Sequence, residues 1–333
     1  MARTSRGFCL VFTGGEAILA ASDSTRTRTE LAPATGDYVV VQDSPEDGPH
    51  IVDIAPRSTA LTRRAPGRVP EPQVLAANVD SVFVMHGLDR QLSVRRIERQ
   101  LVVAWDSGAV PVVVLTKADE VASQALLDET IAEVVEAAPA AEVVATSIMT
   151  KVGIPEIEAK IPPGSTVALM GLSGIGKSAL VNELSGGAVQ RTGEVRATDR
   201  RGRHTTVTRD LIPVPGRGQI IDTPGIREIG LWQAYEGMDK AFPEIAEAAS
   251  ECRFGDCEHE QEPDCAVRDA LASGSIRDRR LAHWRDLMAE LELQEGQLEE
   301  FARRAESRDL ADAQRRQDRE RPNKRSRQRR RRR

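Results

Sequence analysis

The chain has 333 residues, of which 40% are hydrophobic and 3% aromatic, a composition typical of a soluble globular protein with two or three domains. No run of about eighteen apolar residues occurs, which excludes a membrane-spanning protein, and glycines with Glu16 interrupt the N-terminal apolar stretch before a signal-peptide core could form. We therefore expect a cytoplasmic protein without membrane contact.

The first part of the chain, up to about residue 70, is typical of a small all-β domain. Short alternating runs such as "GDYVVVQ" (36–42) and "HIVDIAP" (50–56) are separated by Gly, Pro and Asp turns. This pattern predicts a β-domain, with a five-stranded barrel as one arrangement that fits it.

From about residue 79 the pattern changes to strand-length apolar runs that alternate with helical stretches. The expected strands are "VDSVFVMHG" (79–87), "AVPVVVLT" (109–116), "AEVVATS" (141–147), "STVALMG" (165–171) and "GQIIDTPG" (218–225), with helices near 92–105 and 121–137. Such alternation predicts βαβ units and a mostly parallel sheet covered on both faces.

Two short loops in this part suit a guanine base. "TKAD" follows a strand, and its Asp119 can accept hydrogen bonds from the N1–H and exocyclic amine of guanine, which adenine does not offer, while the stem of Lys117 covers the ring. Thr116 stands where the standard loop has Asn. The next strand ends at Thr146 and Ser147, where a GTPase places a short loop beside the guanine O6.

A phosphate-binding loop follows. "GLSGIGKS" fits G-x-x-x-x-G-K-[ST] between a strand and a helix, so its backbone amides would surround phosphate oxygens, its Lys would neutralise the β and γ phosphates, and its Ser would bind Mg²⁺. The predicted contacts are Gly171, Leu172, Ser173, Gly174, Ile175, Gly176, Lys177, Ser178 and the following Ala179.

Two further segments complete a nucleotide site. "IIDTPG" ends a strand, where Asp222 would contact Mg²⁺ through water and the Gly225 amide would meet the γ-phosphate. Between the two motifs, the polar segment 194–210 is predicted to be a switch, with Thr205 or Thr206 joining Mg²⁺ when the γ-phosphate is present. The alternative is a plain surface loop.

The order of these motifs is unusual, because a GTPase normally has the phosphate loop before the base-reading loops. Here both base loops come first, in the right mutual order, and the phosphate motifs follow in theirs. The sequence therefore predicts a circular permutation, in which the sheet keeps its arrangement while the chain ends have moved.

The C-terminal part is predicted to be helical around a metal site. The spacing C-x₄-C-x-H-x₅-C places three thiolates and an imidazole together, a set that suits a structural tetrahedral Zn²⁺ site; free cysteines clustered by chance are the alternative. The ligands would be Cys252, Cys257, His259 and Cys265. "LAHWRDLMAELELQEGQLEEF" (281–301) has the spacing of an amphipathic helix.

The chain ends in a basic tail. Residues 315–333 carry twelve Lys or Arg against two acids, although the net charge of the whole chain is −5. Such a tail suits docking on a polyanion, or it is a solvated segment without a partner.

The motifs "GDYVVV", "AANVD", "LTKAD", "GLSGIGKSALVN", "GRHTT" and "DTPGIRE", with the cysteine cluster, resemble the ribosome small-subunit-dependent GTPase A family of circularly permuted GTPases. The resemblance runs from about residue 36 to 300. Residues 1–35 match poorly, which implies a barrel shortened at its first strand, and Thr116 implies the loss of one base contact.

The resemblance implies a multidomain protein. Its parts would be an N-terminal OB-fold β-barrel (1–72), a permuted α/β P-loop GTPase domain (73–233), an α-helical zinc-binding domain (234–305) and a disordered basic tail (306–333). It further implies GTP or GDP, Mg²⁺ and Zn²⁺ as bound groups, and the small ribosomal subunit with its 16S rRNA as the partner of a monomer.

Catalysis needs a group that this chain lacks at the usual position. The residue after D-x-x-G is Ile226, which cannot orient a water as the usual Gln does, so we expect slow intrinsic GTP hydrolysis. The predicted catalytic residues are His204 and Thr206. The missing group would come from His204 or from the ribosomal partner, and His204 is otherwise an ordinary loop residue. Alternatives are a module that holds GTP or GDP without turnover, and a P-loop ATPase or kinase.

Overall fold

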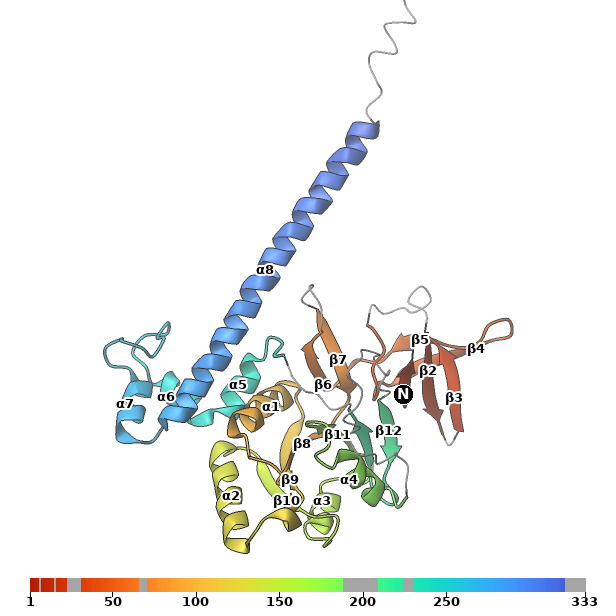
Figure 1. Cartoon of the computed structure of the whole chain (residues 1–333). Coiled ribbons are helices and arrows are strands. Elements are labelled where there is room, and N and C mark those ends of the chain that lie inside the picture. The colour runs from red at the N-terminus through yellow and green to blue at the C-terminus, as the bar shows by residue number, and fades with distance from the viewer. Residues whose placement is uncertain are drawn as a thin grey trace, which may run out of the picture.

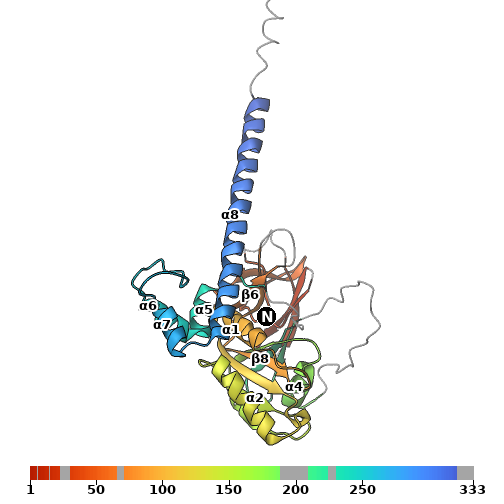
Figure 2. The ribbon, with the colours of Figure 1, turned by 60° about the vertical axis from the view of Figure 1, so that its left-hand side comes forward.

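The structure is a computed structural model, and it describes residues 1–5, 7–14, 16–22, 31–65, 71–187, 209–223 and 230–320. A small β-sheet comes first, then a larger sheet with helices, then a group of helices whose last member, α8, projects away from the rest (Figure 1). Figure 2 shows the same projection from a second direction.

The N-terminal sheet has the strand order β1-β2-β3-β5-β4. Its strands are β1 (Arg3–Ser5), β2 (Phe8–Thr13), β3 (Glu16–Ala21), β4 (Val39–Ser44) and β5 (Gly48–Ile54). Neighbours are antiparallel, except that β3 meets β5 in parallel at Ala21 and His50. The predicted β-structure is confirmed, and three strands lie within residues 1–35, where the family motifs are weakest. The OB-fold assignment stays a prediction.

A hairpin connects this sheet to the rest. It consists of β6 (Ala60–Arg64) and β7 (Pro72–Ala77), which the sequence analysis did not distinguish from the first domain. Gly36 allows the N-terminal sheet to approach β7, because a Cβ on Gly36 would lie 2.0 Å from the carbonyl oxygen of Ala77. The left-handed φ of +97° at Gly36 also favours glycine there.

The central sheet has the order β10-β9-β8-β11-β13-β12. Its strands are β8 (Ser81–Gly87), β9 (Val110–Thr116), β10 (Glu142–Thr146), β11 (Thr166–Met170), β12 (Asp210–Pro213) and β13 (Gln219–Asp222). All neighbours are parallel except β12, which pairs antiparallel with β13. The predicted mostly parallel sheet is confirmed, with β11 between the earlier strands β8–β10 and the later strands β13 and β12.

Helices cover both faces of this sheet because successive strand residues point in opposite directions. Val82 and Val84 of β8 belong to a core with Ile97 of α1, whereas Phe83 and Met85 belong to the opposite core. The helices of this part are α1 (Val94–Asp106), α2 (Gln124–Ala137), α3 (Ile154–Ala159) and α4 (Lys177–Leu184), with a short 3₁₀ turn at Ala118–Glu120. The near-continuous apolar runs of the strands follow from this double burial.

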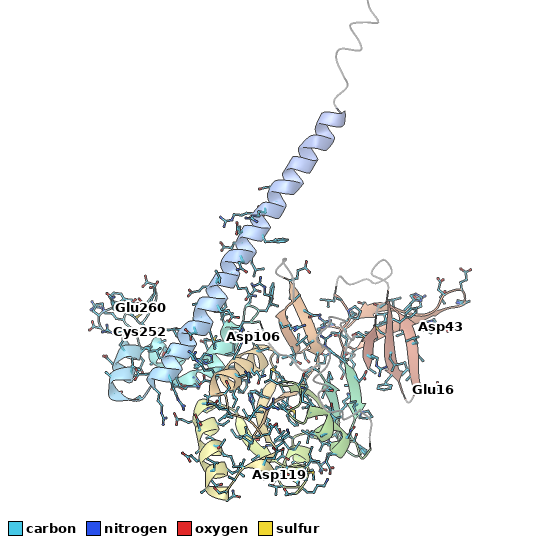
Figure 3. All side chains as sticks on the ribbon, in the orientation of Figure 1. Glu16, Asp43, Asp106, Asp119, Cys252 and Glu260 are labelled. Atoms are coloured by element: carbon cyan, nitrogen blue, oxygen red, sulfur yellow. The ribbon has the colours of Figure 1, made fainter. Side chains whose placement is uncertain are left out.

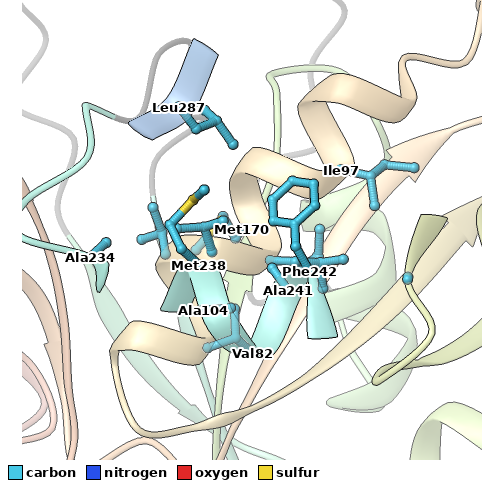
Figure 4. Packing of buried hydrophobic residues seen from close by; sticks show 14 of the residues in the cluster. Val82, Ile97, Ala104, Met170, Ala234, Met238, Ala241, Phe242 and Leu287 are labelled. Atoms are coloured by element: carbon cyan, nitrogen blue, oxygen red, sulfur yellow. The ribbon is translucent and has the colours of Figure 1, made fainter. Parts of the chain in front are cut away.

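The C-terminal helices extend the core on the α1 side of the sheet. They are α5 (Tyr235–Ala241), α6 (Pro243–Ser250), α7 (Ala266–Ser273) and α8 (Asp278–Glu320). Figure 4 shows Met238 of α5, Phe242 between α5 and α6, and Leu287 of α8 packed beside Ile97 and Ala104 of α1. The C-terminal helices and the central sheet therefore share one hydrophobic core.

A buried charge network lies at the same interface. The Arg280 guanidinium of α8, 3% exposed, donates to Glu98 of α1 at 3.0 Å and to Glu244 of α6 at 3.0 Å. It also lies over the Phe242 ring at 4.6 Å, and His283 bonds the second oxygen of Glu98. Because each buried charge has a partner of opposite sign, the network fixes how α8 and α6 sit on α1.

Helix α8 is longer than the composition predicts. It continues to Glu320, past residue 305, where the sequence analysis places the start of a disordered tail. Just before this point, Arg304 pairs with Glu300 one turn earlier, a spacing that supports an exposed helix. Within the described residues, no helix is long and apolar enough to cross a membrane. The domain boundaries themselves stay predictions.

Candidate functional site

The phosphate loop has the backbone that its glycines predict. Gly171–Ser178 connects β11 to α4, and Gly174 and Gly176 adopt left-handed φ values of +79° and +98°. A Cβ on Gly171 would lie 2.6 Å from the carbonyl oxygen of Met85, so a larger residue would push the loop off β8. Ser173 and Gly174 are exposed, whereas Ile175 is buried and anchors the loop.

Lys177 points back into this loop. Its Nζ donates to the carbonyl oxygens of Gly171 at 2.9 Å and Leu172 at 2.8 Å, and the residue is 8% exposed. Burial lowers the pKa of Lys177, and the charge of Asp222 partly opposes this effect. In this structure the loop carbonyls accept the hydrogen bonds of the desolvated Lys177 ammonium. A bound phosphate would take their place and would give the ammonium an anionic partner. Ser178 and Ala179, both half-buried, follow in the first turn of α4.

A cavity of about 260 Å³ lies beside the phosphate loop and brings together segments far apart in the sequence. The predicted residues Thr116, Lys117, Asp119, Thr146, Gly176 and Ala179 all line it. The sequence analysis missed Glu120, Ile148, Met149 and Leu180, which also line it. Figure 3 labels Asp119 at this edge of the sheet. TKAD, the loop after β10 and the phosphate loop therefore lie around one cavity, as a shared nucleotide site requires.

Thr116 links the base loop to the phosphate loop directly. Its hydroxyl donates to the carbonyl oxygen of Ile175 at 2.6 Å, with the carbonyl oxygen of His86 at 3.2 Å as a second acceptor. The residue is 3% exposed, so this hydrogen bond is shielded from water. A short hydroxyl thus connects the two loops where the standard loop has a longer amide.

Lys117 is held by a residue that no motif predicted. Its backbone is left-handed, with φ of +60°, and its Nζ lies 2.7 Å from Asp89 Oδ2. Arg90 donates to the same carboxylate at 3.0 and 3.1 Å. The hydrogen bond from Arg90, with that from Lys117, lowers the pKa of Asp89 to about 2, so the carboxylate stays ionised.

The loop after β10 is organised by its own hydroxyl groups. Thr146 Oγ1 donates to the carbonyl oxygen of Val152 at 3.0 Å, and Ser147 Oγ accepts from the Thr150 amide at 3.1 Å. Both side chains are about 1% exposed. Thr146 lines the cavity, but Ser147 does not. Ser147 therefore shapes the loop from behind the cavity.

Asp222 ends β13, where the sequence places a metal contact. Register pairs it with Leu169 of β11, which leads into the phosphate loop, and the buried Thr223 hydroxyl donates to the Leu169 carbonyl. The oxygens of Asp222 and Ser178 are the ligand type that Mg²⁺ prefers, so these residues fit that ion. The predicted residues His204, Thr205, Thr206 and Gly225 lie outside the described residues.

The predicted metal ligands converge in the C-terminal helical part. The ligand atoms of Cys252, Cys257, His259 and Cys265 all lie within 4.8 Å of one another. The Nδ1 atom of His259 is 3.6 Å from Cys252 Sγ and 3.5 Å from Cys265 Sγ, and these sulfurs are 3.9 Å apart.

These separations match a tetrahedral zinc site. Bond lengths of roughly 2.3 Å to sulfur and 2.0–2.1 Å to nitrogen would place two sulfurs about 3.8 Å apart and sulfur and nitrogen about 3.6 Å apart. Two of the four ligands, His259 and Cys265, are buried. Trp284 of α8 packs on His259, with ring centroids 5.8 Å apart. With four protein ligands the site has no open position, so it fits a structural role.

Comparison with known proteins identifies the family. The model of the RsgA GTPase family matches residues 54–232. The chain belongs to the RsgA GTPase family. It is 40% identical over 299 residues to the small ribosomal subunit biogenesis GTPase RsgA of Methanosarcina acetivorans, covering 90% of this chain and 80% of that relative. The RsgA of Streptomyces coelicolor is 44% identical, with 86% and 78% covered.

Solved structures agree with the fold of this RsgA family member. The crystal structure of YjeQ from Thermotoga maritima has a TM-score of 0.62 at 26% identity, covering 87% of this chain and 98% of that one. YloQ, described as a circularly permuted GTPase, has a TM-score of 0.61 at 23% identity, covering 87% and 93%. The predicted family and the permuted strand order are therefore confirmed, and the chain is a GTP hydrolase.

Proposed function

We propose that this GTPase binds the small ribosomal subunit through its 16S rRNA and hydrolyses GTP during late maturation of the subunit. The main support is the cavity that Asp119 and the phosphate loop line together, in a chain whose relatives are named small ribosomal subunit biogenesis GTPases. Low intrinsic hydrolysis that the subunit stimulates is part of the proposal, because Ile226 replaces the usual water-orienting Gln.

The nucleotide would lie across the edge of the sheet. Asp119 would accept from the guanine, and the stem of Lys117 would cover the ring. Lys177 would move from the loop carbonyls to the phosphates, and the amides of the phosphate loop would donate to the phosphate oxygens. Ser178 and Asp222 would hold Mg²⁺, which supplies charge neutralisation on the β and γ phosphates.

The hydrolytic group is proposed to come from the switch segment. His204 would orient the attacking water, and Thr205 or Thr206 would sense the γ-phosphate together with the Gly225 amide. Docking on the subunit would bring these residues to the γ-phosphate, which couples turnover to the partner.

The rest of the chain is proposed to grip the subunit. Residues 1–72 would form an OB-fold, 73–233 the GTPase domain, 234–305 a Zn²⁺-stabilised helical domain, and 306–333 a basic extension. The two outer domains would contact rRNA phosphates from either side. Basic side chains and backbone N–H groups bind the sugar-phosphate backbone of RNA without reading specific bases. The protein would act as a cytoplasmic monomer.

The decisive experiment measures multiple-turnover GTP hydrolysis with purified small subunits, large subunits or neither. Stimulation by small subunits alone is the expected result. His204→Ala should then lower the stimulated rate without changing GDP affinity. Equal rates in all three conditions would refute the proposed partner.

A second function is favoured by one observation, the aliphatic Ile226 directly after D-x-x-G. In that alternative the protein holds GTP or GDP on RNA as a regulatory module without significant turnover. Tight nucleotide-dependent binding to small subunits, with no stimulation of hydrolysis, would support it.

A further inference from the structure

Asp89 holds Lys117 of the base loop, although neither the motifs nor the proposed function assigns Asp89 a role. It follows β8, whose last residue, Gly87, pairs in register with Thr116 of the base loop. Its side chain is 17% exposed, and its carboxylate accepts from Lys117 at 2.7 Å and from Arg90 at 3.0 and 3.1 Å. Two cations therefore share this one carboxylate, and one of them, Lys117, lines the pocket.

Asp119 differs from Asp89 in its charged neighbours. It is exposed and lines the cavity, and within the described residues no cation pairs with it. Lys117 is two residues away and lines the same cavity. The hydrogen bond to Asp89 raises the pKa of Arg90, and the charge of Glu120, which also lines the cavity, adds to this effect. Without Asp89, both cations would be left to pair with other carboxylates at this cavity, of which Asp119 is one.

This competition matters because Asp119 reads guanine only as a free acceptor. A carboxylate already paired with Lys or Arg would have to break that charge-assisted hydrogen bond before it could accept from a base. An occupied Asp119 would lose the contacts that distinguish guanine, whereas contacts to the phosphates would be unaffected.

We propose that Asp89 is a positioning residue for base selectivity, which holds Lys117 and Arg90 away from Asp119 so that the Asp119 carboxylate remains available to guanine. This inference rests on the proposed contact between Asp119 and the base. It does not depend on the ribosomal partner.

Gly87 gives the arrangement a second test. A Cβ on Gly87 would lie 2.5 Å from Asp89 Oδ1, so Gly87→Ala must displace the carboxylate without changing any charge. The nearest backbone atom, Ile175 Cα, would be 3.6 Å away, which is ordinary contact. The substitution therefore acts on Asp89 before it acts on the phosphate loop.

The experiment measures displacement of a fluorescent GDP analogue by GDP and by IDP, which lacks the exocyclic amine that Asp119 would bind. The variants are Asp89→Asn and Gly87→Ala. The matched control is Glu183→Gln, which removes a lysine–carboxylate pair of 2.6 Å between Lys151 and Glu183. Asp119→Asn tests the base contact itself.

For Asp89→Asn we expect the affinity for GDP to fall about tenfold and the affinity for IDP to fall about threefold. The ratio of GDP affinity to IDP affinity, which is the GDP preference, should therefore decrease. Gly87→Ala should shift the preference in the same direction, and Glu183→Gln should leave it unchanged. Asp89→Glu, which keeps the charge, should recover most of the preference.

Two results would overturn the inference. Unchanged affinities of Asp89→Asn for both GDP and IDP would show that Asp119 needs no such protection, and an equal loss of affinity for GDP and IDP would show that Asp89 only stabilises the loop. If Asp119→Asn also leaves the preference unchanged, the proposed base contact fails as well. If Asp119→Asn abolishes the preference, the base contact stands and only the role of Asp89 fails.

Discussion

Thr116→Val tests whether one buried hydroxyl couples base reading to the phosphate loop. Valine has nearly the same shape as threonine, so the substitution removes the donor to the Ile175 carbonyl without leaving a cavity. The second acceptor, the His86 carbonyl, is more distant, and a hydroxyl has only one proton, so the loss amounts to about one hydrogen bond.

The magnitude follows from burial. A typical hydrogen bond contributes about 1 kcal/mol, and a buried acceptor left without its donor raises the cost to as much as about 3 kcal/mol. Because Thr116 is 3% exposed, water cannot replace the lost donor in the folded protein. If the whole cost appears in nucleotide binding, affinity falls roughly 5- to 150-fold.

The assay is equilibrium titration with a fluorescent GDP analogue, together with thermal unfolding of the protein without nucleotide. Thr116→Ser keeps the hydroxyl and should bind GDP nearly as wild type does. Thr116→Val should bind more weakly. If Thr116→Val binds GDP within twofold of wild type, the contact does not couple the two loops; a lower melting temperature with unchanged affinity would limit its role to stability.

Three further predictions concern stability. Glu98→Gln should lower the free energy of unfolding by about 3 kcal/mol, measured with urea, because Arg280 loses the buried one of its two carboxylate partners. Burial raises the pKa of Asp106 to about 6, so its stabilisation is present at low pH and is lost as pH rises through this value. The melting temperature of wild type relative to Asp106→Asn should therefore fall between about pH 4 and pH 7. Cys252→Ser should lower both the bound zinc and the melting temperature.

Each of these has a clear contrary result. Unchanged urea unfolding of Glu98→Gln would mean that Glu244 alone satisfies Arg280. A parallel pH dependence of wild type and Asp106→Asn would mean that the carboxyl is hydrated in the folded state. Full zinc content in Cys252→Ser, measured by metal analysis, would exclude Cys252 as a ligand.

Much of the fold and of the site could be predicted because residues that are close in the sequence determine the local backbone and bring the site residues together. The glycines of Gly171–Ser178 need left-handed backbone, the strand before them is apolar after Thr166, and the four metal ligands lie within fourteen residues. Such short-range patterns constrain geometry directly. The hairpin β6–β7 was missed because its strands are short and their alternation is weak.

The motifs and their order, from which the permuted GTPase follows, can be recognised in the amino-acid sequence alone. Which side chains meet across the sheet becomes known only from the folded chain. The hydroxyl of Thr116 reaches Ile175, 59 residues later, and Asp89 reaches Lys117, 28 residues later. No local pattern records these contacts, because they depend on the parallel register of β8, β9 and β11, which forms only when both faces of the sheet are buried.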